Sequence, residues 1–229
     1  MPDMKRIPYL LVILSCFLGL SCQPQRALPV IPLTTDYCEF HTGDLIFVCD
    51  TAGMGNAIQS STGGKKDQHV FTHVTITECT DSGIYVIDAT PRLGVSRRTL
   101  GEFILSVTGG DPDRPFTQYA YYYQVTVTFD TLQLEKRLHA FVGLPYDPYF
   151  MPDNGRMYCS ELVYECFFDC NGHHLFPVKP MNFKAADGSM PLYWQEHFGQ
   201  LGTAIPQDMP GTNPNDMSKS PILRPFKLE

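Results

Sequence analysis

One cysteine and one histidine in this sequence have the settings that a thiol nucleophile and its general base require. Cys159 falls in the first turn of a helix that the apolar spacing predicts over residues 158–170. Unpaired backbone N–H groups and the positive end of the helix dipole favour a thiolate there, and the thiolate is the nucleophilic form of cysteine. His73 lies in a strand predicted over residues 72–77, where a rigid element can hold an imidazole in place. The pair predicts covalent catalysis through an acyl-enzyme.

Each of these residues also has a purely structural interpretation. Cys159 shares an apolar stripe with Cys166 and Cys170 on the predicted helix, so it can equally be a small buried hydrophobic residue. Strand alternation places His73 on the face of Phe71, and a lone histidine in a strand is more often structural than catalytic. The pair therefore needs support from the rest of the chain.

The elements that must position these residues follow from hydrophobic periodicity. The sequence predicts strands over residues 43–49, 72–77, 84–89 and 119–129, with a hairpin turn at 81–83 between the second and third. It predicts helices over residues 100–107, 132–142 and 158–170, and a helical turn over 53–61. Strands interspersed with a few helices indicate an α+β domain with an antiparallel sheet.

Composition limits the classes of protein to which the chain can belong. The 229 residues are 43% hydrophobic and 18% charged, which excludes a disordered protein and leaves room for one large domain. Lys and Arg number 17 against 24 Asp and Glu, a net charge of -7, and the cations are scattered along the chain. Because a phosphate-backbone binder needs a basic patch, nucleic acid is excluded as an expected partner.

The first 21 residues have the layout of an export signal. Lys5 and Arg6 precede an almost wholly apolar run that closes at Ser21 and Cys22, and the run is shorter than the about 20 residues of a spanning helix. A Cys after a small residue at that point resembles a bacterial lipoprotein signal, in which Cys22 becomes lipidated. Cleavage before Cys16 and an uncleaved anchor helix are the alternatives. The protein is therefore expected in the bacterial cell envelope, anchored to the membrane through a lipid.

Beyond residues 1–21, residues 22–36 contain three prolines and predict a tether, and residues 37–229 form the expected domain. Export permits disulfides, but the spacing of the remaining cysteines indicates no particular pairing. These cysteines are Cys38, Cys49, Cys79, Cys166 and Cys170.

Several motifs in one order resemble a known family. They are Gly43-Asp44-Leu45-Ile46-Phe47, Thr72-His73-Val74 and Tyr158-Cys159-Ser160-Glu161-Leu162-Val163, with Gly143-Leu144-Pro145-Tyr146-Asp147 before the last and Gly211-Thr212-Asn213-Pro214 near the end. In this order they resemble the permuted papain-like cysteine amidases and peptidases, the YiiX-like branch of the NlpC superfamily. In that arrangement the histidine strand precedes the cysteine helix, the reverse of papain.

The resemblance implies a role for each candidate. Cys159 would be the nucleophile, His73 the base, and Asp88 the third residue that orients the imidazole, although relatives commonly carry Glu or another polar residue there. The backbone N–H of Cys159 would stabilise an oxyanion. No metal and no cofactor is implied.

The resemblance also implies the class of substrate. An amide bond in cell-wall peptides, such as peptidoglycan fragments, is the first expectation, and a lipid amide or an acyl-transfer substrate is the second. The expected substrate-binding residues are Tyr146, Tyr158 and Trp194, with Tyr149 and Phe150 as further aromatic residues near the cleft.

Two non-catalytic interpretations compete with the enzyme. A structural zinc site is suggested by Cys166, Cys170, His173 and His174, but the two cysteines also fit the buried stripe of a helix. A binding lipoprotein would keep the cleft without turnover, because sequence alone does not show that the cysteine, histidine and aspartate converge.

Overall fold

The computed structural model describes residues 40–49, 53–63, 69–111 and 120–226. All of them belong to one compact unit, Leu33–Glu229, and the other unit, Met1–Pro32, lies outside the described residues. The expected signal peptide, Cys22, the whole tether and Cys38 lie outside the described residues. Among the helices of the described part, none is both long and apolar enough to cross a bilayer.

A six-stranded antiparallel sheet forms the centre of the fold, with the order β4-β3-β2-β1-β5-β8. The strands predicted over residues 43–49, 72–77 and 84–89 are confirmed as β1, β2 and β3. The strand predicted over residues 119–129 is present as β5 but is shorter than predicted. Strands β4 and β8 come from segments without clear alternation of apolar and polar residues. The strands of this sheet are β1 Leu45–Val48, β2 His73–Thr80, β3 Gly83–Thr90, β4 Gly94–Thr99, β5 Ala120–Val125 and β8 Leu223–Phe226.

Six helices and a small second sheet complete the described structure. The predicted helices over residues 100–107 and 132–142 are present, while α5 and α6 come from the Pro- and Gly-rich remainder. The helices are α1 Met54–Thr62, α2 Leu100–Thr108, α3 Thr131–Phe141, α4 Cys159–Cys166, α5 Leu192–Leu201 and α6 Pro214–Met217. The second sheet pairs β6 Lys179–Pro180 with β7 Pro210–Gly211.

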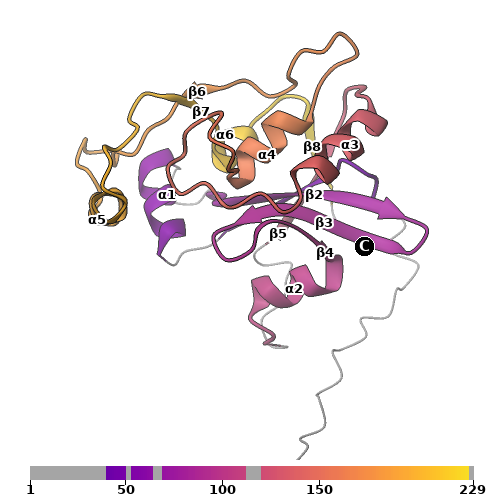
Figure 1. Cartoon of the computed structure of the whole chain (residues 1–229), viewed down its shortest axis with the longest axis horizontal. Coiled ribbons are helices and arrows are strands. Elements are labelled where there is room, and N and C mark those ends of the chain that lie inside the picture. Colours follow the sequence, from indigo (N-terminus) through magenta and orange to yellow (C-terminus); the bar gives the residue numbers. More distant parts are fainter. Residues whose placement is uncertain (1–39, 50–52, 64–68, 112–119, 227–229) are drawn as a thin grey trace, which may run out of the picture. The chain divides into compact units, whose positions relative to one another are not determined.

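The two faces of the main sheet carry different helices (Figure 1), because buried side chains alternate along each strand. On one face, residues such as Val74, Ile76 and Ile87 pack against α3 and α4 in the largest hydrophobic cluster. On the other face, Ile46 and Val86 pack against α2. A third cluster joins α1 and α5 through Ala57, Phe150, Tyr158, Met181, Phe183, Trp194 and Phe198.

Helix α4 ends four residues earlier than the periodicity predicts. It ends at Cys166, and Phe167 has extended backbone dihedrals. Beyond it, the Asp169 carboxylate accepts backbone N–H bonds from Asn171 and His173 and so stabilises a turn. The prediction that Cys170 lies on the buried stripe is therefore wrong, since Cys170 is exposed.

Candidate active site

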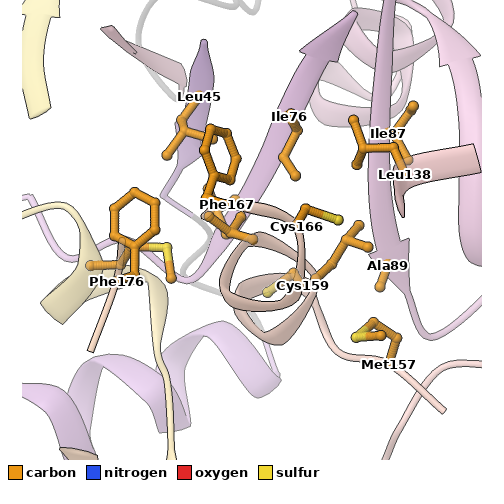
Figure 2. Packing of buried hydrophobic residues seen from close by; sticks show 14 of the residues in the cluster. Leu45, Ile76, Ile87, Ala89, Leu138, Met157, Cys159, Cys166, Phe167 and Phe176 are labelled. Carbon is orange, nitrogen blue, oxygen red and sulfur yellow. The ribbon is translucent and has the colours of Figure 1, made fainter. Parts of the chain in front are cut away.

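Cys159 is the first residue of α4 and packs against the central sheet. Its side chain belongs to the cluster that contains Ile87 and Ala89 of β3, and Figure 2 shows these residues beside Cys166 of the same helix. Glu161, two residues further along α4, accepts a hydrogen bond from the backbone N–H of Tyr158 at 3.2 Å. This contact satisfies one of the amide groups that a helix start leaves unpaired.

His73 opens β2 and bonds directly to Asp88. Its Nε2 lies 2.7 Å from Oδ2 of Asp88. The register of β2 and β3, with Ile76 opposite Ile87, places Asp88 diagonally across from His73, a separation that these side chains can bridge. Because Nε2 is occupied by Asp88, Nδ1 is the nitrogen left for Cys159, whose charge acts on the imidazole.

Phe71 does not lie where strand alternation predicts. It packs with Val74 and Ile76 in the large cluster, although His73 was expected to share its face. The prediction is wrong because regular strand begins only at His73, so the alternation does not extend back to Phe71.

The electrostatics of the His73 site favour the charged imidazolium. Burial is the largest single influence and would by itself lower the pKa of His73. The negative charge of Cys159, the hydrogen bond to Asp88, the interaction with the Cys159 sulfur and the charge of Asp88 together outweigh it and raise the pKa of His73 to about 10. These surroundings therefore favour a protonated His73 across the neutral range.

Asp88 is fully buried and would be costly to ionise without partners. Burial alone would raise its pKa, but the hydrogen bond from His73 and the charges of His73 and Arg98 hold the pKa below its ordinary value. Nη2 of Arg98 lies 2.8 Å from each carboxylate oxygen. Asp88 is therefore kept as a carboxylate between two cationic groups.

Arg98 itself is held by helix α2 on the far face of the sheet. Its Nη1 donates to the hydroxyl of Ser106 at 3.0 Å, and its guanidinium lies 5.4 Å from the ring centroid of Phe103. Cys159 belongs to the hydrophobic cluster between α4 and the opposite face of the sheet. The contacts from Cys159 through His73 and Asp88 to Arg98 thus cross the sheet at the start of β2.

A cleft of about 400 Å³ opens beside Cys159 and His73. All three residues predicted to bind substrate, Tyr146, Tyr158 and Trp194, line it, while Asp88 lies behind His73 and does not. Phe150 also lines the cleft, but Tyr149 lines a separate hollow with Arg156, so its expected place near the cleft is wrong. The sequence did not reveal that Tyr149 and Phe150 point in different directions.

An unusual backbone conformation places Phe150 in the wall of the cleft. Its φ of 54° is in the left-handed region, which an aromatic residue rarely adopts. The buried carboxylate of Asp147 accepts backbone N–H bonds from Tyr149 at 2.9 Å and Met151 at 2.8 Å, on either side of it. These bonds stabilise the loop, and the ring of Phe150 packs edge-on against Trp194 at 5.9 Å.

Trp194 connects α5 to α1 in the wall of the cleft that also contains Phe150. Its indole N–H donates to the Ser61 hydroxyl at 3.1 Å, and that hydroxyl donates to the carbonyl of Phe183 at 2.9 Å. Trp194 is only 2% exposed. Its apolar face therefore lines the cleft while its one polar group is satisfied by α1.

The motif Gly211-Thr212-Asn213-Pro214, near the end of the chain, contacts the start of α4. The hydroxyl of Thr212 donates to the Ser160 hydroxyl at 3.0 Å, and its backbone N–H donates to the Tyr158 hydroxyl at 3.2 Å. A Cβ at Gly211 would lie 2.5 Å from the Met181 sulfur, so a larger residue there would displace the Met181 side chain. Thr212 was not predicted as a site residue, although its motif was noted.

The side chains of the suggested zinc site do not converge. Cys166 is buried, Cys170 is exposed, and His173 bonds to Asp169 while His174 stacks on Tyr164. Across the described ranges, no group of three or more His, Cys, Asp or Glu side chains has a geometry that could hold a metal ion. The five cysteines of the described part are all free thiols.

Comparison with known proteins agrees with this architecture. Residues 39–225 match the family described as permuted papain-like amidase enzyme, YaeF/YiiX, C92 family. A solved structure titled metalloprotein yiiX from Escherichia coli O157:H7 superposes with a TM-score of 0.62 at 21% identity, covering 82% of this chain and 97% of that one. At this identity the likeness concerns the fold alone. A search of curated proteins finds no match. Because the family match covers most of the sequence, the chain belongs to the permuted papain-like amidases and is a hydrolase of the cysteine peptidase or amidase type.

Proposed function

We propose that this protein hydrolyses an amide bond with Cys159 as the nucleophile, His73 as the general base and acid, and Asp88 as the residue that orients His73. The observation that carries the proposal is that Cys159 and His73 line one cleft and that His73 is hydrogen-bonded to Asp88 behind it. A nucleophile, a base and an orienting group in that order are the requirements of this type of catalysis.

The reaction has two halves. The Cys159 thiolate attacks the carbonyl carbon, and the backbone N–H groups at the start of α4 stabilise the negative charge on the oxygen. The C–N bond then breaks, and the His73 imidazolium gives its proton to the leaving amine. Water, deprotonated by His73, next attacks the thioester and releases the carboxylic acid and the Cys159 thiol.

Two features of the chain support the permuted papain-like arrangement for this mechanism. The strand that carries His73 precedes the helix that carries Cys159 along the sequence. Cys159 is also the first residue of that helix, where the dipole stabilises a thiolate. Both features follow the pattern that the sequence motifs imply.

The proposed location rests on the sequence before the described unit. Residues 1–21 are the proposed signal peptide, Cys22 the lipidated residue, residues 22–36 the tether and residues 37–229 the enzyme domain. The protein would then be attached to the membrane through the lipid on Cys22 alone. In the cell envelope the available amides are cell-wall peptides and lipid amides, the two substrate classes considered.

The test compares turnover in variants that keep the fold. Purified domain is incubated separately with peptidoglycan fragments and with N-acyl amino acids, and products are identified by mass spectrometry. We expect Cys159→Ser and His73→Ala to abolish turnover while far-UV circular dichroism is unchanged. Cys170→Ser is the control, because Cys170 is an exposed thiol outside the site. Full activity in Cys159→Ser would overturn the proposal.

A further inference from the structure

One residue contacts both chain neighbours of the proposed nucleophile. The hydroxyl of Thr212 donates to the Ser160 hydroxyl at 3.0 Å, and the backbone N–H of Thr212 donates to the Tyr158 hydroxyl at 3.2 Å. Tyr158 and Ser160 stand directly before and after Cys159 at the start of α4. The start of this helix is therefore tied to a segment that lies 52 residues beyond Ser160 in the chain.

The two hydroxyl groups that Thr212 contacts are buried. Ser160 has no exposed surface, and among the residues that the structure describes Thr212 is the one hydrogen-bond partner of its hydroxyl. Tyr158 is 5% exposed, and its hydroxyl also lies 3.5 Å from the hydroxyl of Thr212. Because a buried hydroxyl that loses its partner costs free energy, displacement of α4 from Thr212 is disfavoured.

The segment that carries Thr212 is itself fixed on both sides. Before it, Gly211 belongs to β7, which pairs with β6. After it, Asn213 caps α6, since its Oδ1 accepts the backbone N–H of Asp216 at 2.8 Å. Helix α6 lies beside α4 (Figure 1). Thr212 is therefore held between two ordered elements, as a residue that supports a reactive group must be.

The bonds within α4 do not fix its start relative to the rest of the site. The Tyr158 N–H donates to Glu161, and the Leu162 N–H donates to the Tyr158 carbonyl. Both bonds join residues of one helical turn, so they would move together with the helix. His73 lies on a different element, β2. The place of Cys159 relative to His73 therefore depends on contacts between α4 and other elements, and a displacement of about 1 Å can slow a reaction by about a hundredfold.

We propose that Thr212 is a positioning residue, which holds the start of α4 so that the Cys159 sulfur and backbone N–H keep their reactive places. It acts through Ser160 and Tyr158 and takes no part in making or breaking bonds. Thr212 also lines the cleft, but its hydroxyl proton is engaged by Ser160. This inference rests on the proposed function, since it assigns to Thr212 a role in the same reaction.

The first test removes the Thr212 hydroxyl. In Thr212→Val, which keeps the backbone N–H and the branched shape, we expect kcat to fall by about ten- to a hundredfold while KM changes by less than about twofold. Thr212→Ser keeps the hydroxyl and should have a kcat within about threefold of wild type. Thr77→Val is the matched control, because it removes a buried hydroxyl that donates to the His41 carbonyl at 2.7 Å, outside the cleft. An unchanged kcat in Thr212→Val, or an equal loss in Thr77→Val, would overturn the proposal.

The second test asks whether the effect passes through Ser160. Ser160→Ala removes the acceptor instead of the donor, so it should lower kcat by a factor similar to that in Thr212→Val. The double variant should show no further loss, because the two residues share one interaction. If Thr212 contacted the substrate directly, the two losses would instead multiply. Multiplied losses, or a raised KM in Thr212→Val with kcat unchanged, would overturn the positioning role.

Hydrogen exchange separates this proposal from the proposed function, because it needs no substrate. In Thr212→Val and in Ser160→Ala, we expect the backbone amides of residues 158–162 to exchange at least about tenfold faster than in wild type, since the start of α4 would open more often. Thr77→Val should leave these amides unchanged. Faster exchange in a protein that hydrolyses no amide, even as wild type, would refute the proposed function and retain Thr212 as the residue that fixes α4. Unchanged exchange in both variants would overturn the positioning role.

Discussion

Nη2 of Arg98 lies 2.8 Å from both carboxylate oxygens of Asp88, whose other partner is the imidazole of His73. Asp88 has no exposed surface and Arg98 is 14% exposed, so the pair is shielded from water. A carboxylate this buried remains ionised only with such partners. We therefore expect Arg98 to be a positioning residue, which acts on the proposed catalytic pair through Asp88.

Removal of Arg98 should alter the pH dependence of the reaction. In Arg98→Met the pKa of Asp88 should rise, because the cation that helps to lower it is gone. Asp88 would then become protonated at a higher pH, so the acid limb of the kcat/KM profile should move upward. We also expect kcat/KM at neutral pH to fall by about tenfold or more.

Arg97→Met is the matched control for this experiment. Arg97 is the neighbouring residue on β4, but its Nε donates to Glu78 at 2.5 Å, so it partners a different buried carboxylate. Its loss should lower thermal stability without moving the acid limb. Arg98→Lys should restore the acid limb, since the charge returns, but recover only part of the rate. Identical pH profiles for wild type and Arg98→Met would refute the positioning role.

The direct contact of Asp88 with His73 predicts a large effect of Asp88→Asn. Because Nε2 and Oδ2 are 2.7 Å apart with no intervening water needed, we expect turnover to fall by about a thousandfold. The measurement is kcat with the preferred amide, beside a His73→Ala variant. An active Asp88→Asn enzyme next to an inactive His73→Ala enzyme would show that another group orients the imidazole.

The same substitution should also destabilise the fold, because it leaves the Arg98 cation without its carboxylate. We expect the free energy of unfolding to fall by about 3 kcal/mol, measured by urea denaturation. The double variant Asp88→Asn/Arg98→Met removes the unpaired charge and should regain part of this loss. No recovery in the double variant would mean that the two residues are not energetically coupled.

Cys159 should react with alkylating reagents under mildly acidic conditions that leave the other described thiols unmodified. In the proposed mechanism the positive charge of His73 activates the Cys159 sulfur, so iodoacetamide at about pH 6 should label Cys159 first. Burial raises the pKa of Cys49, and that of Cys79 with nearby acidic groups, to about 11, and burial raises that of Cys166 still further. Exposed Cys170 is the internal control for access. Peptide mass spectrometry showing Cys170 labelled ahead of Cys159 would contradict the ion pair.

Glu161 should make the protein less stable as pH rises. Burial, with Asp147, Glu165 and Asp153 nearby, raises its folded pKa from the ordinary 4.5 to about 8. Between these values the native state holds a proton that the unfolded state has lost, so the stabilisation present below about pH 4.5 declines until about pH 8. Glu161→Gln should therefore raise the melting temperature more at alkaline than at acidic pH. Glu196→Gln, on an exposed position of α5, should show no such difference.

Cys22 provides a test of the proposed anchor. If Cys22 is lipidated, protein extracted from membranes with detergent should carry the mass of the acyl groups at a new N-terminus beginning with Cys22. Cys22→Ala should remain unprocessed by lipoprotein maturation, and should leave the membrane fraction only if the signal is cleaved by another route. An intact mass with unmodified Cys22 in membrane-extracted wild type would rule the anchor out.

Local sequence patterns determined the strands and helices near the site. The alternating segments around His73 and Asp88 form β2 and β3, and the apolar spacing after Cys159 forms α4. These predictions hold because side-chain periodicity depends only on nearby residues and on which face meets the core. The end of α4 was mispredicted, since apolar Phe167 continues the stripe although the backbone leaves the helix.

Helix α5 was missed although a local signal existed. Pro191 precedes it, Gly202 follows it, and Trp194, Phe198 and Leu201 have helical spacing. The position of Trp194 in the cleft could not be read from that spacing, because it depends on the Ser61 hydroxyl more than a hundred residues earlier. Contacts of this kind are decided only when the tertiary structure brings α1 and α5 together.

Arg98 shows most clearly what the sequence alone does not contain. The segment Gly94–Thr99 has polar residues on both faces and gives no hydrophobic pattern, so it was not predicted as a strand. The adjacent residues Arg97 and Arg98 point to opposite faces, where each meets a different buried carboxylate. Sequence determined the chemistry of the candidate residues, whereas the tertiary structure decided their partners, because burial and pairing of charge depend on chain segments that are distant in sequence.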